Sequence, residues 1–130
     1  MRFIDLSTWD RAMHYQAFRN SVQPQYCVTF DLDITNFLPK IKAKGYSFTF
    51  AFVFAVTKCA NQIEAFRCRF VDGKPAVLDT VNTSFTYLKK GTELFKVVNV
   101  PMQDSMEEYV ALARETEETQ TAYFTGPMGN

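Results

Sequence analysis

The chain has 130 residues, with 14 basic and 14 acidic side chains, so its formal net charge is zero. This length fits one domain with a core of its own, and the balanced charge argues against a basic nucleic-acid-binding face. Aromatic residues make up 15% of the chain and include 13 Phe, so a wide apolar surface needs a core, a pocket or a subunit interface to cover it.

The first half of the chain predicts three helices and one strand. Ser7 is a plausible N-cap for a helix that carries an apolar stripe to about residue 20. Residues 26–32 are rich in aromatic and β-branched side chains and predict a strand. Asp33 then caps a helix over residues 34–44, which Gly45 ends. Residues 47–61 are apolar on nearly all sides and predict a buried helix.

The second half predicts a hairpin, two further strands and an acidic helix. Asp72-Gly73 separates residues 66–71 from residues 74–78, which is a strong hairpin signal, and Pro75 places the second arm at a sheet edge or in a short pairing. Residues 83–89 alternate as a strand does, and residues 94–100 predict another strand or an extended segment. Residues 105–121 predict a helix capped by Asp104 or Ser105. This order predicts an α+β fold, a two-layer sandwich of a mixed sheet with helices on one face.

Cellular context is indicated by what the sequence lacks. The sequence contains no stretch of 18 uninterrupted apolar residues, so it does not predict a membrane span. The first residues lack the apolar region of a signal peptide. The three cysteines form no Cys-x-x-Cys pair and are odd in number, which suits reduced thiols in the cytoplasm. We therefore expect a cytoplasmic protein.

Composition and spacing alone do not name a reaction. His14, the only His, lies in the middle of the first predicted helix with no nucleophile nearby, so a structural or surface role is favoured. Cys59, on an apolar helix, is expected to pack as a small hydrophobe. Three Cys and one His without tight spacing do not predict a zinc site, and the five Gly form no phosphate-binding loop. The acidic side chains of residues 107–118 and the Lys of residues 40–44 are interpreted as solvated helix faces.

The four Phe between residues 48 and 54 are spaced by two, and two interpretations stay open. Core packing is the default, whereas a pocket for an aromatic ligand is the sharper alternative. Periodicity does not decide between them.

Several motifs occur in an order that resembles the chloramphenicol acetyltransferases. The resembling segments are Ser7-Thr8-Trp9-Asp10-Arg11, His14-Tyr15, Ala17-Phe18, Leu32-Asp33-Ile34-Thr35, Asn61 with Phe66-Arg67 and Asp72-Gly73, Val77-Leu78-Asp79-Thr80-Val81, Phe85-Thr86, and Thr92-Glu93-Leu94-Phe95. Each motif alone is weak, but the ordered set is specific and covers most of the chain. The resemblance implies the fold of that family and its reaction.

That reaction is the transfer of an acetyl group from acetyl-CoA to a hydroxyl of chloramphenicol, which inactivates the antibiotic. By the resemblance, a catalytic His acts as general base, an oxyanion donor assists it, and no metal takes part. The resemblance also implies a homotrimer, with the active site at the subunit interface, and no nucleic-acid or membrane partner.

The sequence departs from the family at the catalytic motif. The family carries His-His-x-x-x-Asp-Gly near its C-terminus and a Ser in a Ser-x-x-Trp-like segment, and this sequence has neither. His14 matches an early His of the family and not the catalytic one. We therefore expect residues 1–130 to form a single, incomplete domain that contains the acceptor-pocket half, has no catalytic residue of its own and is inactive alone. The alternatives are a non-catalytic small-molecule binding module and part of a related acyltransferase.

The resemblance assigns roles to a few positions. Arg11 matches an Arg that supports the active site by pairing with the Asp of the missing motif. Positions that match the acceptor pocket are Ala17, Phe18, Val22, Pro24, Tyr26 and Phe95. An apolar, aromatic pocket would suit a nitrophenyl acceptor.

Overall fold

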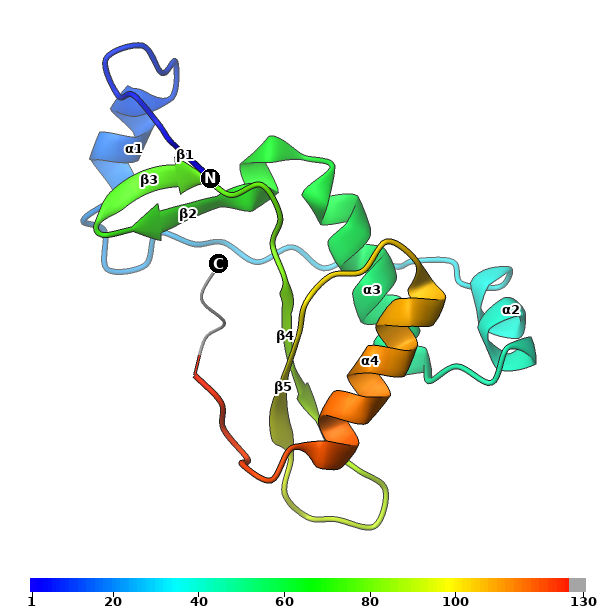
Figure 1. Ribbon diagram of the computed structural model, residues 1–130. Helices are drawn as coiled ribbons and strands as arrows, with labels where there is room; N and C mark the ends of the chain where they lie inside the picture. Colours follow the sequence, from blue (N-terminus) through cyan, green and yellow to red (C-terminus); the bar gives the residue numbers. More distant parts are fainter. Residues whose placement is uncertain (127–130) are drawn as a thin grey trace.

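Two helices and a two-stranded sheet form the main body of the computed structural model, which describes residues 1–126. The helices α3 (Phe48–Asn61) and α4 (Met106–Thr119) pack against each other, and they cover the antiparallel strands β4 (Thr83–Tyr87) and β5 (Lys96–Val100). Figure 1 shows these elements in the centre, with α4 running alongside the β4–β5 ribbon. The predicted helix over residues 47–61 and the strands predicted over residues 83–89 and 94–100 are confirmed.

The main core lies between these elements. Its buried residues are Ile41, Phe50, Ala51, Phe54, Val98, Val100, Tyr109, Val110 and Ala113. The ring of Phe54 lies 5.3 Å from that of Tyr109, and the ring of Phe50 lies 5.0 Å from that of Tyr87. Phe85 and Tyr87, which alternation placed on one face of the strand, both pack against this core.

The second sheet has three short antiparallel strands in the order β1–β3–β2. They are β1 (Arg2–Phe3), β2 (Cys68–Val71) and β3 (Lys74–Val77). The predicted hairpin is confirmed: Asp72 (φ 50°) and Gly73 (φ 72°) both adopt the left-handed conformation that a tight type I′ turn requires.

Of the two expectations for the arm that contains Pro75, a sheet edge or a short pairing, the structure shows the short pairing, with the two-residue strand β1. The strand β3 lies between β1 and β2. The carbonyl of Pro75 accepts a hydrogen bond from the Ile4 N–H at 2.9 Å. The return hydrogen bond, from residue 75 to the Ile4 carbonyl, would need an N–H that proline lacks. The strand β1 ends at Phe3, one residue before Ile4. A central strand therefore tolerates Pro75 because its short neighbour stops there.

The first helix is shorter than predicted. The helix α1 spans only Ala12–Phe18, and Ser7 does not cap it. Instead, the backbone N–H and the hydroxyl of Ser7 both donate to Asp5 Oδ1, at 2.9 and 2.7 Å. These hydrogen bonds lower the pKa of the Asp5 carboxyl. A local turn built on the Asp5 side chain thus replaces the expected helix start.

The predicted strand over residues 26–32 is not formed in the part of the chain that the structure describes. The segment is extended and exposed and has no strand beside it. It leads to α2 (Phe37–Ala43), which ends as predicted at Gly45 (φ 68°). The side chain of Asp33 accepts the Thr35 N–H at 2.8 Å in the turn before α2 and does not cap the helix itself. Hydrogen bonding from the Thr35 side chain, and then from its N–H, lowers the pKa of the Asp33 carboxyl.

The α+β class is confirmed. Within residues 1–126 the strands form two separate antiparallel sheets, not one mixed sheet. A 3-10 turn, η1 (Glu64–Arg67), joins α3 to β2. Ser105 caps α4: its hydroxyl accepts the Glu108 N–H, and the Glu108 carboxylate accepts from the Ser105 N–H, a complete capping box.

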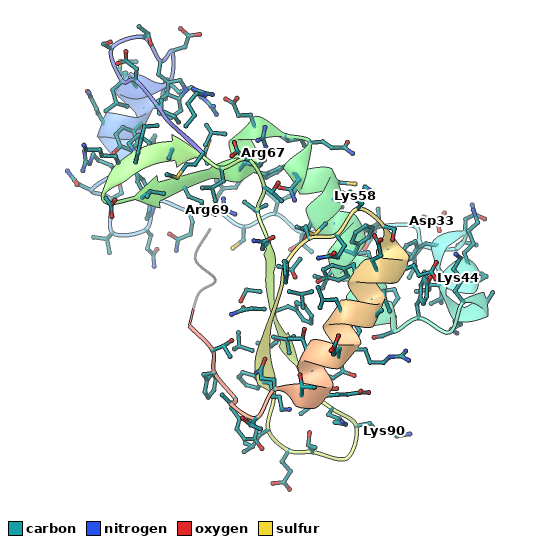
Figure 2. All side chains as sticks on the ribbon, in the orientation of Figure 1. Asp33, Lys44, Lys58, Arg67, Arg69 and Lys90 are labelled. Atoms are coloured by element: carbon teal, nitrogen blue, oxygen red, sulfur yellow. The ribbon has the colours of Figure 1, made fainter. Side chains whose placement is uncertain are left out.

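Two side chains join the main body to the three-stranded sheet by holding the backbone between β3 and β4. The Asn61 amide donates to Val81 O at 3.0 Å and accepts the Val81 N–H at 2.7 Å. The Arg67 guanidinium donates to the carbonyls of Leu78 and Asp79, at 2.8 and 3.2 Å. Figure 2 shows Arg67 at this junction, between the hairpin and the top of β4. The family-like Asn and Arg therefore have a structural use.

We predict that Asn61→Ala destabilises the fold, because Val81 is buried and loses both partners of its backbone groups. Unsatisfied buried polar groups cost about 1–3 kcal/mol each, so two such groups predict a loss of at least about 2 kcal/mol in urea unfolding. The neighbouring exposed Gln62→Ala is the matched control and should stay within about 0.5 kcal/mol of the parent. Equal stability of the two variants would contradict the role of Asn61.

We predict that the contribution of Tyr109 to the free energy of unfolding is lost at alkaline pH. Tyr109 is fully buried, and its burial raises the pKa of the phenol above the ordinary 10.0. The protonated phenol is therefore stabilised by folding, and this stability is full below pH 10 and is lost as the pH rises through the raised value.

The Tyr109→Phe variant keeps the ring but loses the hydroxyl bond to Thr83, so we expect a cost of about 1 kcal/mol at pH 8. The difference in unfolding free energy between the parent and Tyr109→Phe should shrink as the pH of the measurement approaches and exceeds 10. A difference that stays constant or grows would show that the buried phenol has no such linkage.

Candidate functional site

The residues assigned to an acceptor pocket near α1 lie on the surface of the chain. Ala17 and Phe18 are exposed in the last turn of α1. In the loop that follows, Val22 is 99% exposed, Tyr26 is 88% exposed, and Pro24 is exposed as well. None of these side chains lines one of the main cavities in the described part of the chain.

Arg11 directly precedes α1, and its guanidinium lies 5.0 Å from the centre of the Trp9 ring. Such a cation–π contact orients the head group without neutralising it. Among the described residues, no carboxylate lies within ion-pair distance of Arg11. The charge of Arg11 is thus held beside the Trp9 ring.

Phe95 lies apart from the α1 group. It directly precedes β5 and is half-exposed, and its ring meets that of Phe124 edge to face, 5.9 Å between centroids. Figure 1 shows α1 beside the three-stranded sheet and the start of β5 at the opposite end of the β4–β5 ribbon. One chain therefore does not bring Phe95 together with the residues of the α1 region.

A small cavity of about 240 Å³, lined by both apolar and charged side chains, lies beside the segment that contains Phe95. It is lined by Tyr87, Lys89, Thr92, Leu94, Lys96, Glu117 and Tyr123. Lys96 Nζ donates to the carbonyls of Glu117 and Gln120, at 3.1 and 2.7 Å, and so closes the C-terminal end of α4. Lys89 Nζ lies 3.6 Å from Glu117 Oε1.

Glu117 corrects the interpretation of the acidic residues of α4 as a solvated face, because it is buried. Its neighbours Glu107, Glu108, Glu115 and Glu118 are exposed, as expected. Helical spacing contained the signal: Glu117 follows Ala113 by four residues and therefore continues the buried stripe of α4.

An apolar groove of about 650 Å³ lies between the segment before α2 and the outer face of α3. It is lined by Phe30, Leu32, Asp33, Ile34, Phe37, Phe52, Ala55, Val56, Cys59, Ala60, Ile63 and Phe66. The expectation that Cys59 packs in the core is wrong, because its side chain is exposed on this groove. The four Phe of residues 48–54 are divided between the core and the surface. Phe50 and Phe54 are buried in the core, whereas the rings of Phe48 and Phe52 stack on the outer face of α3 with their centroids 5.4 Å apart.

Few groups suited to acid–base or metal chemistry gather in the part of the chain that the structure describes. His14 is exposed on α1 and has no side-chain hydrogen bond there. No group of three His, Cys, Asp or Glu within residues 1–126 could hold a metal ion. None of the helices in that range is long and apolar enough to cross a bilayer.

Comparison with known proteins supplies what the geometry alone does not. The family model described as chloramphenicol acetyltransferase matches residues 1–130, the whole chain. The chain belongs to this family. A solved chloramphenicol acetyltransferase superposes with a TM-score of 0.83 at 26% identity, over 92% of this chain and 57% of that one.

Curated chloramphenicol acetyltransferases match over less than their full length. The protein of Proteus mirabilis is 34% identical over 92 residues, which are 71% of this chain and 42% of that protein. The protein of Klebsiella sp is 30% identical over 107 residues, which are 82% of this chain and 49% of that protein. The chain thus spans about half the length of the curated chloramphenicol acetyltransferases that it matches.

We predict that Lys96→Met destabilises the chain by about 2 kcal/mol, since a charged donor to two carbonyls at the end of α4 is lost. The matched control is Lys90→Met, at the exposed tip of the β4–β5 loop labelled in Figure 2. That variant should stay within about 0.5 kcal/mol of the parent in urea unfolding. Comparable losses for the two variants would mean that Lys96 has no anchoring role.

Proposed function

We propose that this chain supplies the acceptor-binding half of an acetyl-CoA-dependent O-acetyltransferase of the chloramphenicol acetyltransferase type. The observation that carries the proposal is the family match over all 130 residues. The ordered motifs from Ser7 to Phe95 support it, because they extend over both the main body and the three-stranded sheet. The acceptor would be a hydroxylated small molecule such as chloramphenicol.

The proposed reaction needs a general base beside the acceptor hydroxyl and a donor for the oxyanion of the tetrahedral intermediate. His14, the only His of the sequence, is exposed and has no hydrogen-bonded partner among the described residues, so it is not proposed as that base. The base would come from the His-His-x-x-x-Asp-Gly segment of the family fold. Arg11 would pair with the Asp of that segment, which its unpaired guanidinium supports.

The geometry supports a pocket shared between surfaces. Ala17, Phe18, Val22, Pro24 and Tyr26 form an exposed apolar wall, and Phe95 lies at the other end of the molecule. A homotrimer in which a neighbouring subunit faces this wall would join the two groups. We propose such a trimer, with acetyl-CoA as the acetyl donor and antibiotic inactivation as the result.

We further propose a cytoplasmic location. The three cysteines are free in the structure, and exposed or half-buried thiols persist in a reducing compartment.

The expected result for the 130-residue chain alone is no release of CoA thiol from acetyl-CoA and chloramphenicol, because the base is missing. A complete family member serves as the positive control, and heat-inactivated chain as the blank. Calorimetry with chloramphenicol should show no binding below millimolar concentration, since the wall residues are exposed on one side.

Turnover well above the blank would overturn the assignment of the base to the family's C-terminal motif. Tight chloramphenicol binding without turnover would favour the alternative, a non-catalytic binding module.

A further inference from the structure

The Glu117 carboxylate is a buried charge whose hydrogen bonding is incomplete. The residue is 5% exposed, and its Oε1 atom accepts no hydrogen bond from the residues that the structure describes. Lys89 Nζ lies 3.6 Å from Oε1, which is too long for a hydrogen bond, and the Lys89 side chain is 56% exposed. A charge removed from water is costly unless it is both paired and hydrogen-bonded. Glu117 Oε1 is therefore an acceptor that a further donor would satisfy.

This carboxylate forms part of the wall of the cavity of about 240 Å³ beside the β4–β5 loop. Separate parts of the chain build the wall, namely the two strands, the loop between them, α4 and the segment that follows it. The loop contains a turn in which the Thr92 N–H and hydroxyl both donate to the Lys89 carbonyl, at 3.1 and 2.7 Å. Cavities for drug-sized ligands measure about 300–1,000 Å³, so this one suits a smaller molecule.

The polar groups of the cavity restrict the chemistry of a ligand. Lys96 is engaged already, because its Nζ donates to the carbonyls of Glu117 and Gln120. Glu117 Oε1 needs a donor from the ligand, and the Lys89 ammonium beside it needs an acceptor. A carboxylate ligand has no proton to donate, and an ammonium ligand has no lone pair with which to accept. A neutral hydroxyl does both, so it can bridge Oε1 and Nζ.

The apolar part of the lining suits an aromatic ring. Tyr87, Leu94 and Tyr123 line the cavity together. Leu94 and Tyr123 are partly exposed, so a ligand would cover apolar surface that the chain alone leaves in water. Aromatic side chains favour aromatic partners through stacked and edge-to-face contacts. The lining therefore indicates a hydroxyl carried on an aromatic body.

We propose that this cavity binds a small neutral phenol or aromatic alcohol, whose hydroxyl donates to Glu117 Oε1 and accepts from Lys89 Nζ. The site is separate from the acceptor pocket proposed above, because Phe95 and the exposed residues near α1 are not among its lining residues. It lies on the α4 side of the β4–β5 ribbon, since Tyr87 packs against the main core and pairs with Lys96 in register. The inference does not depend on the proposed acetyl transfer.

The first experiment is a titration of the 130-residue chain with phenol, followed through the backbone amide signals in NMR spectra. We expect saturable shifts at residues 89–96 and 117–123, with a dissociation constant on the order of 1 mM for a ligand of so few atoms. Signals of residues 52–63 monitor the apolar groove on α3 and separate binding there from binding in the cavity. Absence of saturable shifts around Glu117 up to about 20 mM phenol overturns the proposal.

Three further probes, toluene, benzoate and benzylammonium, keep the aromatic ring and change the polar group. Toluene leaves Oε1 without a donor, benzoate brings a second anion to it, and benzylammonium offers no acceptor to Lys89. Each should bind in the cavity at least about tenfold more weakly than phenol. Equal affinity for toluene would show that the hydroxyl has no role, and tighter binding of either ion would assign the cavity to a charged ligand. Both outcomes overturn the proposal.

The role of Glu117 is tested with Glu117→Met, which keeps the length of the side chain and suits the buried stripe of α4. The phenol affinity should fall at least about tenfold, since the charged acceptor is lost. The matched control is Glu118→Met, at the exposed neighbouring position of the same helical turn, which should bind phenol as the parent does.

A second variant leaves every buried residue unchanged. Lys89→Met removes the donor at a half-exposed position, so the chain should fold and the phenol affinity should fall about threefold or more. Its control is Lys90→Met, the next residue of the loop, which does not line the cavity. Parent-like phenol affinity in Glu117→Met, or in Lys89→Met where Glu117→Met does not fold, overturns the proposal.

Discussion

The buried side chain of Tyr109 is the contact on which the main body depends. Its ring packs on Phe54 of α3, and its hydroxyl lies 2.7 Å from the hydroxyl of Thr83 on β4. Thr83 in turn donates to the carbonyl of Val100 on β5 at 2.8 Å. One residue of α4 thus joins a helix and two strands through apolar and polar contacts at once. A buried tyrosine is stable only when its hydroxyl is paired, and this chain of bonds fixes how the layers align.

Beyond that core, the distribution of apolar side chains is uneven. Residues that face Tyr109 are buried almost completely, whereas Tyr26, Val28 and Phe30 are largely open. This contrast explains why a chain with so many Phe has a modest core. The aromatic residues are divided between a packed interior and two open surfaces, the wall near α1 and the groove on α3.

Local signals in the sequence predicted the local structure well. The Asp72-Gly73 hairpin and the cap of α4, expected at Asp104 or Ser105, depend on neighbours only a few residues apart; the hairpin is confirmed, and the cap is Ser105. The strand over residues 26–32 was wrong for a different reason: a strand is defined by its partner, and none of the described residues pairs with it. The prediction that Ser7 caps the first helix was wrong because its N–H and hydroxyl donate to the nearby Asp5 instead.

The candidate site could be predicted only in part. The ordered motifs were sufficient to identify the family, but the positions of Arg11, Phe18 and Phe95 relative to one another depend on tertiary contacts that no sequence pattern encodes. Helical spacing could have indicated that Glu117 is buried, although the acidic character of its neighbours concealed this. The groove on α3 had no signal of its own, because an apolar helix face that is buried and one that is open have the same sequence pattern.

The pairing of β1 has a consequence for the order of folding. Arg2 and Phe3 pair with Val77 and Ala76, so two residues close a loop of more than seventy. The entropy of closing such a loop is large, and a two-residue strand returns little for it, whereas the β2–β3 hairpin closes over a two-residue turn. We expect the hairpin to form early and the N-terminal arm to dock last. The arm is then the first region to open in the native state, and it carries α1, the element on which the proposed acceptor wall is built.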